Sequence, residues 1–284
     1  MAETTNSEYN LTDYPSFRLR YNLCKNSLSE TDKKVAEFFI ANPNAVYQSI
    51  TDVVKEAGVG YGSVIRFCQR LGCNGYQDFK VLLAHDLALF SEEKVRSRST
   101  PLNEYLTRTI DHLKATCHLC NDDLLEKVAG LFLESNQIVI GAVAGSAPTA
   151  VDFGYHLIRV GIPCTVLTDG FLFGIHAASL TSKDLLFIIN FSGATKSLVH
   201  GAELAKKADV KVVAITNFLT SPMAKIADHC FFTAEDRDPL SVELHSSLPS
   251  IFVVGALFEK ILGLRKNAAE MVRKTFSAIS DQKM

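Results

Sequence analysis

The sequence lacks the long apolar runs and the leader pattern of membrane or exported chains. No stretch of its 284 residues approaches about 18 consecutive apolar residues. Residues 1–10 are polar and mildly acidic, without a cationic start followed by an apolar core, so we expect no signal peptide and no membrane span. These absences predict a cytoplasmic protein with no membrane partner.

The sequence also lacks a dominant sign of charge and an ordered cysteine pattern. A formal net charge of −2 argues against a surface that is basic throughout, but it is compatible with one local basic surface. The seven cysteines show no disulfide framework, as expected for reduced thiols in a cytosolic chain. Cys117 and Cys120 form a lone CxxC around His118, and a zinc site would need a second ligand pair. We therefore predict no metal and no cofactor.

What the chain does have is the composition of a globular protein. Apolar residues make up 47% and charged residues 21%, which separates the chain from disordered sequences. Its length is sufficient for two domains. The residue pattern predicts an all-α domain over 1–90, a polar and charged linker over 91–100, and an α/β domain over 101–284.

Helical periodicity in the first domain predicts a helix-turn-helix. Residues 1 to about 27 show no sustained period. The first predicted helix begins at a capping box, in which Ser29 is the cap and Asp32 answers it from the first turn, and it ends at Asn42. The next predicted helices cover 50–57, 61–71 and 76–90. Gly58 and Gly60 lie in the short segment between the second and the third helix. Two helices joined by a tight glycine-containing turn form a helix-turn-helix.

The second helix of such a motif enters the major groove, where its first exposed residues meet base edges. Arginine and glutamine have the donor geometry for bases, whereas serine, arginine and lysine suit phosphates. Three cations within residues 61–80 outweigh the single acid, Asp78. The alternative is a solvated face on a structural helical bundle. The residues expected to face DNA are Tyr61, Gly62, Ser63, Arg66, Gln69, Arg70 and Lys80.

Apolar segments in the second domain alternate with helical segments. The predicted strands are 137–143, 164–167, 185–190, 210–216 and 229–233. Helices over 102–119 and 122–134 precede them, and an apolar helix over 246–264 follows them. This alternation predicts an α/β fold, a doubly wound five-stranded parallel sheet of the flavodoxin-like α/β/α kind. Such a sheet binds ligands at the carboxyl ends of its strands.

The segment LLFIINFSGATKS, residues 185–197, has the pattern of a phosphate site. Its apolar run suits a central parallel strand. Ser192, Gly193 and Thr195 then supply hydroxyls and unpaired backbone N–H groups where a helix begins. The positive end of the helix macrodipole stabilises an anion at such a place. The alternative is an ordinary strand-to-helix turn in which Ser and Thr act as caps.

The segment AGVGYGSVIRFCQRLGCNGYQDFK, residues 57–80, resembles the helix-turn-helix signature of RpiR-type bacterial transcription regulators. The rest of the chain resembles their C-terminal SIS (sugar isomerase) domain, and the resemblance covers about residues 20–265. It implies a homo-oligomer, dimer or tetramer, that binds a palindromic operator in double-stranded DNA and responds to a phosphorylated sugar. One departure is the start of the recognition helix, where this chain has Gly60, Tyr61 and Gly62.

The resemblance also implies which residues hold the effector. Ser146 matches a phosphate-binding serine after the first strand, Ser192 and Thr195 match the S-x-S-G-x-T loop with Gly193 inside it, and Asn190 replaces the first serine of that loop. Polar residues that could close the pocket, or simply lie exposed in a loop, are Glu243, His245 and Ser246. Five positions depart from the family and predict a more apolar pocket: Ala142, Ala144, Phe171, Phe191 and Leu248.

The resemblance implies a DNA-binding transcriptional regulator of sugar metabolism whose SIS domain senses a phosphorylated sugar. We predict no enzyme activity and no catalytic residue, because an isomerase needs a positioned base. The candidate bases are Glu243, His245 and His176, and none lies in a recognisable catalytic motif. Two alternatives stay open: an SIS-type sugar-phosphate isomerase, and a regulator or scaffold whose sugar pocket has lost its ligand.

Overall fold

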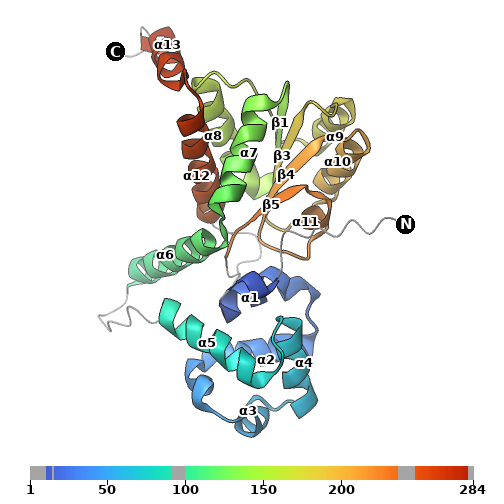
Figure 1. Ribbon diagram of the computed structural model, residues 1–284, viewed down its shortest axis with the longest axis vertical. Coiled ribbons are helices and arrows are strands. Elements are labelled where there is room, and N and C mark those ends of the chain that lie inside the picture. Colours follow the sequence, from blue (N-terminus) through green and yellow to red (C-terminus); the bar gives the residue numbers. More distant parts are fainter. Residues whose placement is uncertain (1–10, 15, 91–99, 236–246, 281–284) are drawn as a thin grey trace. The chain divides into compact units, whose positions relative to one another are not determined.

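The computed structural model describes residues 11–14, 16–90, 100–235 and 247–280 (Figure 1). Its contacts divide the chain into two compact units, Met1–Asp111 and His112–Met284. The division falls inside helix α6 (Pro101–Leu119). All but one residue of the predicted linker over 91–100 lies outside the described residues. No helix of the described part is long and apolar enough to cross a membrane.

The first unit is helical. Its helices are α1 (Phe17–Cys24), α2 (Glu30–Ala41), α3 (Ile50–Ala57), α4 (Tyr61–Arg70) and α5 (Tyr76–Phe90), with 3-10 turns at Leu11–Asp13, Lys25–Ser27 and Pro43–Tyr47. Ser29 and Ser49 begin α2 and α3 with capping boxes, as the sequence predicts for α2. Helix α3 ends at Gly58, whose φ of 61° favours glycine. The chain then passes directly into α4, which completes the helix-turn-helix.

Helix α1 corrects the prediction that the first helix of the chain begins at Ser29. Ser16 caps it by accepting a hydrogen bond from the Leu19 N–H at 3.3 Å. Phe17 lies at the centre of the unit, and its ring centroid is 5.3 Å from that of Phe79. Nearly every side chain of α1 is buried, so its sequence shows no one-sided apolar stripe. Periodicity detects amphipathic helices and misses this one.

The second unit contains a five-stranded parallel sheet in the order β2-β1-β3-β4-β5, which confirms the predicted fold. Its strands are β1 (Ile138–Ala142), β2 (Thr165–Leu167), β3 (Leu185–Ile189), β4 (Lys211–Thr216) and β5 (His229–Phe232). Its helices are α7 (Asp122–Glu134), α8 (Ala147–Arg159), α9 (Gly170–Ser179), α10 (Lys196–Lys207), α11 (Pro222–Ile226), α12 (Leu248–Leu264) and α13 (Ala268–Ser280). Helices α7, α8 and α12 cover one face, and α9, α10 and α11 cover the other (Figure 1).

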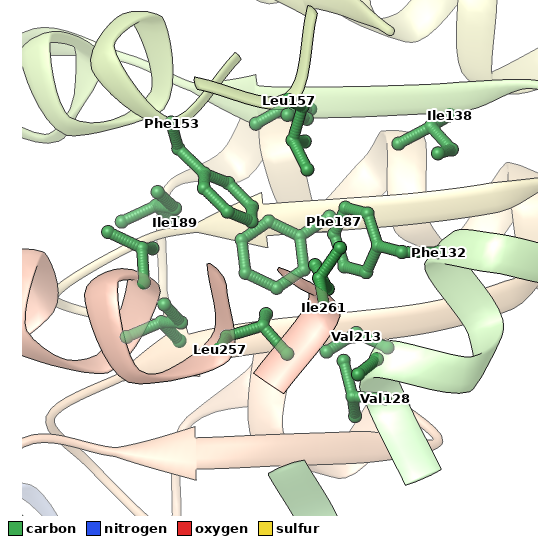
Figure 2. Close-up of a cluster of buried hydrophobic side chains, with 14 of the residues drawn as sticks. Val128, Phe132, Ile138, Phe153, Leu157, Phe187, Ile189, Val213, Leu257 and Ile261 are labelled. Atoms are coloured by element: carbon green, nitrogen blue, oxygen red, sulfur yellow. The ribbon is translucent and has the colours of Figure 1, made fainter. Parts of the chain in front are cut away.

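Aromatic rings fix both faces of this sheet. On one face, Phe187 of β3 packs against Phe132 and Phe153, with ring centroids 5.3 and 5.4 Å away (Figure 2). On the other face, the buried ring of Phe173 lies against Gly141 of β1 and Gly201 of α10. A Cβ added at these glycines would come within 2.1 and 2.3 Å of that ring. The ring therefore requires glycine at both positions.

The strand order creates a switch point between β1 and β3. Ala142 and Ile189 are paired, so the chain leaves both strands at the same level of the sheet edge. Helix α8 follows β1 on one face, whereas α10 follows β3 on the other (Figure 1). Open α/β sheets bind ligands in the crevice at the carboxyl ends of strands that diverge in this way.

Candidate functional site

The loop after β3 folds around the side chain of Asn190. Only 4% of Asn190 is exposed, and its Oδ1 accepts hydrogen bonds from the Thr195 hydroxyl at 2.9 Å and the Ser192 hydroxyl at 3.3 Å. Its amide nitrogen Nδ2 is buried and has no hydrogen-bond partner in the described part of the chain. A buried donor left in this state is unfavourable, and an oxygen atom of a ligand would satisfy it.

Gly193 gives the loop its tight turn. Its φ is +60°, and its N–H donates to the Asn190 carbonyl at 2.9 Å. A Cβ at this position would lie 2.2 Å from Ser221 Oγ and 2.7 Å from Thr216 Oγ1. Both the backbone conformation and the close approach therefore require glycine.

The loop after β1 carries the second group of predicted residues. Ser146 is buried at the start of α8. Ala144 has a φ of +51°, a left-handed conformation that a side chain disfavours. The Ser247 hydroxyl donates to the Gly145 carbonyl at 3.2 Å, which holds the start of α12 against this loop.

Helices α7 to α12 fall into two groups by how they begin. Helices α7, α9 and α11 have side-chain caps from Asn121, Asp169 and Ser221. Helices α8, α10 and α12 begin at Ser146, Thr195 and Ser247, and none of these side chains makes a capping hydrogen bond. Two of the uncapped starts follow neighbouring strands, and the Ser247–Gly145 contact adds the third. Uncapped helix N-termini at one sheet edge attract an anion, and α10 offers the most amides because α8 and α12 have Pro148 and Pro249 at their second positions.

The positions at which the chain departs from the family lie in different surroundings. The Phe191 ring is buried and packs edge-on against Phe218, with centroids 5.8 Å apart. Phe171 is 88% exposed at the start of α9. Ala142 is buried within β1, and Leu248 is the first residue of α12. Phe191 thus packs inside the unit beneath the loop surface, whereas the exposed Phe171 is available to a ligand or a partner.

Three predicted effector residues, Glu243, His245 and Ser246, lie outside the described residues. Within the described part, no group of three or more His, Cys, Asp or Glu side chains could hold a metal ion. In the CxxC segment, Cys117 is exposed, and burial raises the pKa of the Cys120 thiol to about 12.

The helix-turn-helix presents a polar face on α4. Val64, Phe67 and Cys68 are buried against the rest of the first unit. On the outward side lie the exposed Tyr61, Gly62, Arg66, Gln69 and Arg70 and the partly exposed Ser63; Lys80, also partly exposed, belongs to α5. The Arg66 guanidinium donates to the Ser63 hydroxyl at 3.2 Å, so it lies along its own helix. Helix α4 begins at Gly60, and no side chain caps its first amides.

Two of the predicted DNA-facing cations contact other parts of the unit. Arg70 forms an ion pair with Asp32 of α2. Lys80 Nζ donates to the Gln48 carbonyl at 3.3 Å and lies 5.9 Å from the centroid of the Tyr76 ring. The sequence shows their charge and spacing but not these contacts.

The structure also brings forward residues that the prediction omitted. Tyr47, 81% exposed, lies two residues before Ser49, which caps α3, and an aromatic residue so near a capping serine could have singled it out. Thr149 is buried in the first turn of α8, and its hydroxyl has no hydrogen-bond partner among the described residues. No sequence signal distinguishes Thr149 from an ordinary core residue.

A helix-turn-helix unit joined to a parallel α/β unit with open helix starts at its switch point defines a class, the ligand-responsive transcription regulators. Comparison with known proteins agrees. Residues 20–89 match the helix-turn-helix domain of the rpiR family, and residues 131–260 match the SIS domain. The chain belongs to the RpiR family of helix-turn-helix transcriptional regulators that carry a SIS domain.

Individual relatives resemble most of the chain. The HTH-type transcriptional regulator HexR of Escherichia coli (strain K12) is 30% identical over 210 residues, which cover 70% of this chain and 71% of HexR. An uncharacterized HTH-type transcriptional regulator of Caldanaerobacter subterraneus subsp. tengcongensis is 29% identical over 87% of this chain and 90% of its own length. The structure of the Vibrio vulnificus NanR protein complexed with ManNAc-6P is similar with a TM-score of 0.61 and 25% identity, and covers 96% of this chain and 99% of that one.

Proposed function

We propose that this regulator binds a palindromic operator through α4 and senses a phosphorylated sugar at the carboxyl ends of β1 and β3. The observation that carries the effector site is the set of three uncapped helix starts at one sheet edge. A family relative, NanR, has been solved with a phosphorylated sugar, which supports the ligand class. A cytoplasmic location follows from the proposed DNA partner.

In this proposal the phosphate lies between the two loops. Ser146 donates its hydroxyl to the phosphate. On binding, Ser192 and Thr195 turn their hydroxyl hydrogens from Asn190 Oδ1 to the anion, and the uncapped first amides of α10 donate to it. Asn190 Nδ2, buried without a partner, donates to an oxygen of the same ligand. Glu243, His245 and Ser246 contact the sugar from the segment before α12.

We further propose that the site binds its ligand without turnover. Sugar-phosphate isomerisation needs a general base. The described loops after β1 and β3, residues 143–146 and 190–195, supply hydroxyl and amide groups but no carboxylate or imidazole. The candidate bases that remain are Glu243 and His245, which precede α12, and His176 of α9. If the purified protein isomerises a sugar phosphate and Glu243→Gln abolishes the turnover, the enzyme alternative is correct.

The proposed homo-oligomer is supported by an apolar face on α6. Leu102, Leu106 and Ile110 follow one another at four-residue spacing, and all three are exposed together with Tyr105. Such a stripe is typical of a helix that packs against another. Self-association through the helices of residues 101–134 places two recognition helices on the half-sites of a palindrome.

The two activities are coupled by linkage. A phosphorylated sugar that prefers one arrangement of the assembly shifts the population toward it, and DNA affinity changes by no more than the difference in ligand affinity. We propose a repressor that is released by its ligand. Operator binding measured with and without the sugar phosphate tests the sign.

A thermal-shift screen with sugar phosphates tests the effector site. A ligand at about 100 times its dissociation constant should stabilise the fold by about 2.7 kcal/mol. Ser192→Ala should remove this shift, whereas Ser277→Ala, on the exposed side of α13, should keep it. If no sugar phosphate in a broad panel shifts the wild-type protein, the sensing function is wrong and the pocket has lost its ligand.

Arg66→Ala tests the DNA half of the proposal separately. It should abolish selective binding to a duplex that the wild-type protein selects from a random pool, because Arg66 is the exposed arginine in the middle of α4. The thermal shift with sugar phosphate should remain. If the wild-type protein selects no duplex at moderate salt, the operator-binding function is wrong.

A further inference from the structure

The carboxyl end of the recognition helix α4 is held by charged side chains from two other helices. Arg20 of α1 is buried, and its Nη1 donates to the carbonyl of Leu71, the residue that ends α4, at 2.9 Å. Its Nε and Nη2 donate to the carbonyls of Tyr14 and Thr12 at 2.6 and 3.0 Å. A cation at this end of a helix also opposes the negative pole of the macrodipole.

The second tie is the ion pair of Asp32 with Arg70. The Asp32 side chain is only 5% exposed, and the Arg70 side chain is 49% exposed. Asp32 belongs to the capping box of α2, where it accepts hydrogen bonds from the N–H and the hydroxyl of Ser29 at 3.1 and 2.6 Å. Moving Arg70 away to a DNA phosphate would leave the buried carboxylate without its cation, which is strongly unfavourable.

Arg66 and Arg70 therefore differ although they stand one turn apart on the same helix. Arg66 is exposed and contacts Ser63 of its own helix, so reaching a base edge breaks no contact between helices. Arg70 joins α4 to α2. The orientation of α4 in the groove decides whether Tyr61, Arg66 and Gln69 meet base edges, and small displacements lose such hydrogen bonds.

We propose that Arg70 is a positioning residue, and that Arg20, Asp32 and Arg70 form a clamp that sets the orientation of the recognition helix. This inference rests on the proposed operator binding. It reverses the prediction that Arg70 contacts DNA. It also assigns Asp32, an acid next to a DNA-binding helix, a role in strengthening the binding of DNA.

The sign of the effect of Asp32→Asn decides between the two roles of Arg70. Asparagine keeps an acceptor for Ser29 but removes the charge that holds Arg70. If Arg70 contacts phosphate, releasing it and removing a nearby negative charge strengthens DNA binding. If Arg70 is part of the clamp, the same change weakens selective binding. The matched control is Glu37→Gln, which removes one exposed negative charge from the same helix.

The experiment measures dissociation constants for a duplex selected by the wild-type protein and for a scrambled duplex, over a range of salt concentrations. We expect Asp32→Asn and Arg70→Met each to lower the ratio of selected to scrambled affinity about tenfold. The salt dependence on the scrambled duplex should stay as in the wild type. Because a partly unfolded preparation weakens both affinities equally, the ratio separates loss of orientation from loss of folded protein.

Two results would overturn the clamp. One is an Asp32→Asn variant that binds the selected duplex as tightly as Glu37→Gln or more tightly. The other is an Arg70→Met variant whose salt slope falls by about 0.9 for each half-site, the signature of a lost phosphate contact. If the wild-type protein selects no duplex, the proposed operator binding fails first and the clamp fails with it.

Discussion

The two units of the chain treat the starts of their helices in the same selective way, although their folds have nothing in common. In the helical unit, Ser16, Ser29 and Ser49 cap α1, α2 and α3, whereas α4 begins at Gly60 without a side-chain cap. In the sheet unit, α7, α9 and α11 are capped, whereas α8, α10 and α12 are not. Among these helices, the uncapped starts are those at which we propose that a ligand binds, either DNA or a phosphorylated sugar.

The difference between the units lies in the residue at the uncapped start. Ser146, Thr195 and Ser247 could cap their helices but do not, and the hydroxyls of Thr195 and Ser247 bond to Asn190 and Gly145 instead. Gly60 has no side chain to offer. The sheet unit therefore keeps its hydroxyls near the proposed ligand, whereas the helical unit leaves only backbone amides.

The largest expected effect is that of Gly193→Ala, which should disrupt the loop after β3 in the sheet unit. Alanine at φ +60° is strained, and its Cβ would meet Ser221 and Thr216, so we expect a loss of about 3 kcal/mol in the free energy of unfolding. Urea unfolding measures it, and the shift with sugar phosphate should disappear. Gly174→Ala, where an added Cβ meets no atom within 4 Å, is the control. Equal stability of the two variants would show that the turn is not required.

The next effect is a pH dependence of the free energy of unfolding, which arises at the capped start of α1. The Asp86 carboxylate accepts hydrogen bonds from the Ser16 hydroxyl and the Arg18 N–H, and burial raises its pKa from 3.8 to about 6. The folded state therefore binds a proton that the unfolded state has released between pH 4 and 6. The stabilisation is present at pH 4 and is lost as the pH rises through 6.

Urea unfolding at pH 4 and pH 7 checks this dependence. The loss of stability toward pH 7 should be on the order of 2 kcal/mol in the wild type and absent in Asp86→Asn, which keeps an acceptor for Ser16. Asp52 contributes a pH dependence of stability with the opposite sign, because hydrogen bonds from Ser49 lower the pKa of its carboxyl group. Asp52→Asn should remove that contribution. The stabilisation from Asp52 is present above its unfolded pKa and is lost as the pH falls. Parallel curves for wild type and Asp86→Asn would contradict the assignment.

A smaller effect tests whether the open start of α4 matters for DNA. Gly60 has ordinary extended backbone angles, so aspartate fits there and can cap α4. Gly60→Asp should raise the free energy of unfolding by a few tenths of a kcal/mol and weaken duplex binding about tenfold, because its carboxylate occupies the amides and repels phosphate. Fluorescence anisotropy with a labelled duplex measures the affinity. Gly60→Ser adds a neutral cap and should weaken binding less; if both variants bind DNA as the wild type does, the open start has no role in binding.

The smallest effect concerns Ala144 in the loop after β1. Its left-handed conformation, φ +51°, suits glycine, so Ala144→Gly should raise the free energy of unfolding by about 1 kcal/mol. Ala147→Gly, three residues later in right-handed helical conformation, should lower it. Thermal unfolding compares the two. A destabilised Ala144→Gly variant would mean that the loop does not store this strain.

The sheet unit could be predicted from sequence more fully than the helical unit. Apolar strands and crossover helices repeat a simple pattern, and each predicted strand agrees with β1 to β5 within one residue at either end. Helix α1 was missed because its side chains are buried on nearly all sides. The order of residues in the phosphate loop was visible in the sequence. The inward hydrogen bonds of Asn190 were not, because they depend on how the turn at Gly193 folds back.

The pairing of Arg70 shows the same limit. Its partner Asp32 is 38 residues away, and the sequence explains that acid completely as part of a capping box. Asp32 has two structural roles, but only its capping role leaves a pattern in the neighbouring sequence.

The ring of Phe173, held between Gly141 and Gly201, has a consequence for how the family varies. Gly141 belongs to β1, Phe173 to α9 and Gly201 to α10, and the Phe173 ring alone fills the space between these three elements. A relative with a small residue at position 173 should therefore carry a larger one at 141 or 201. The three columns of a family alignment should covary in size, and this covariation records the docking of α9 and α10 on β1.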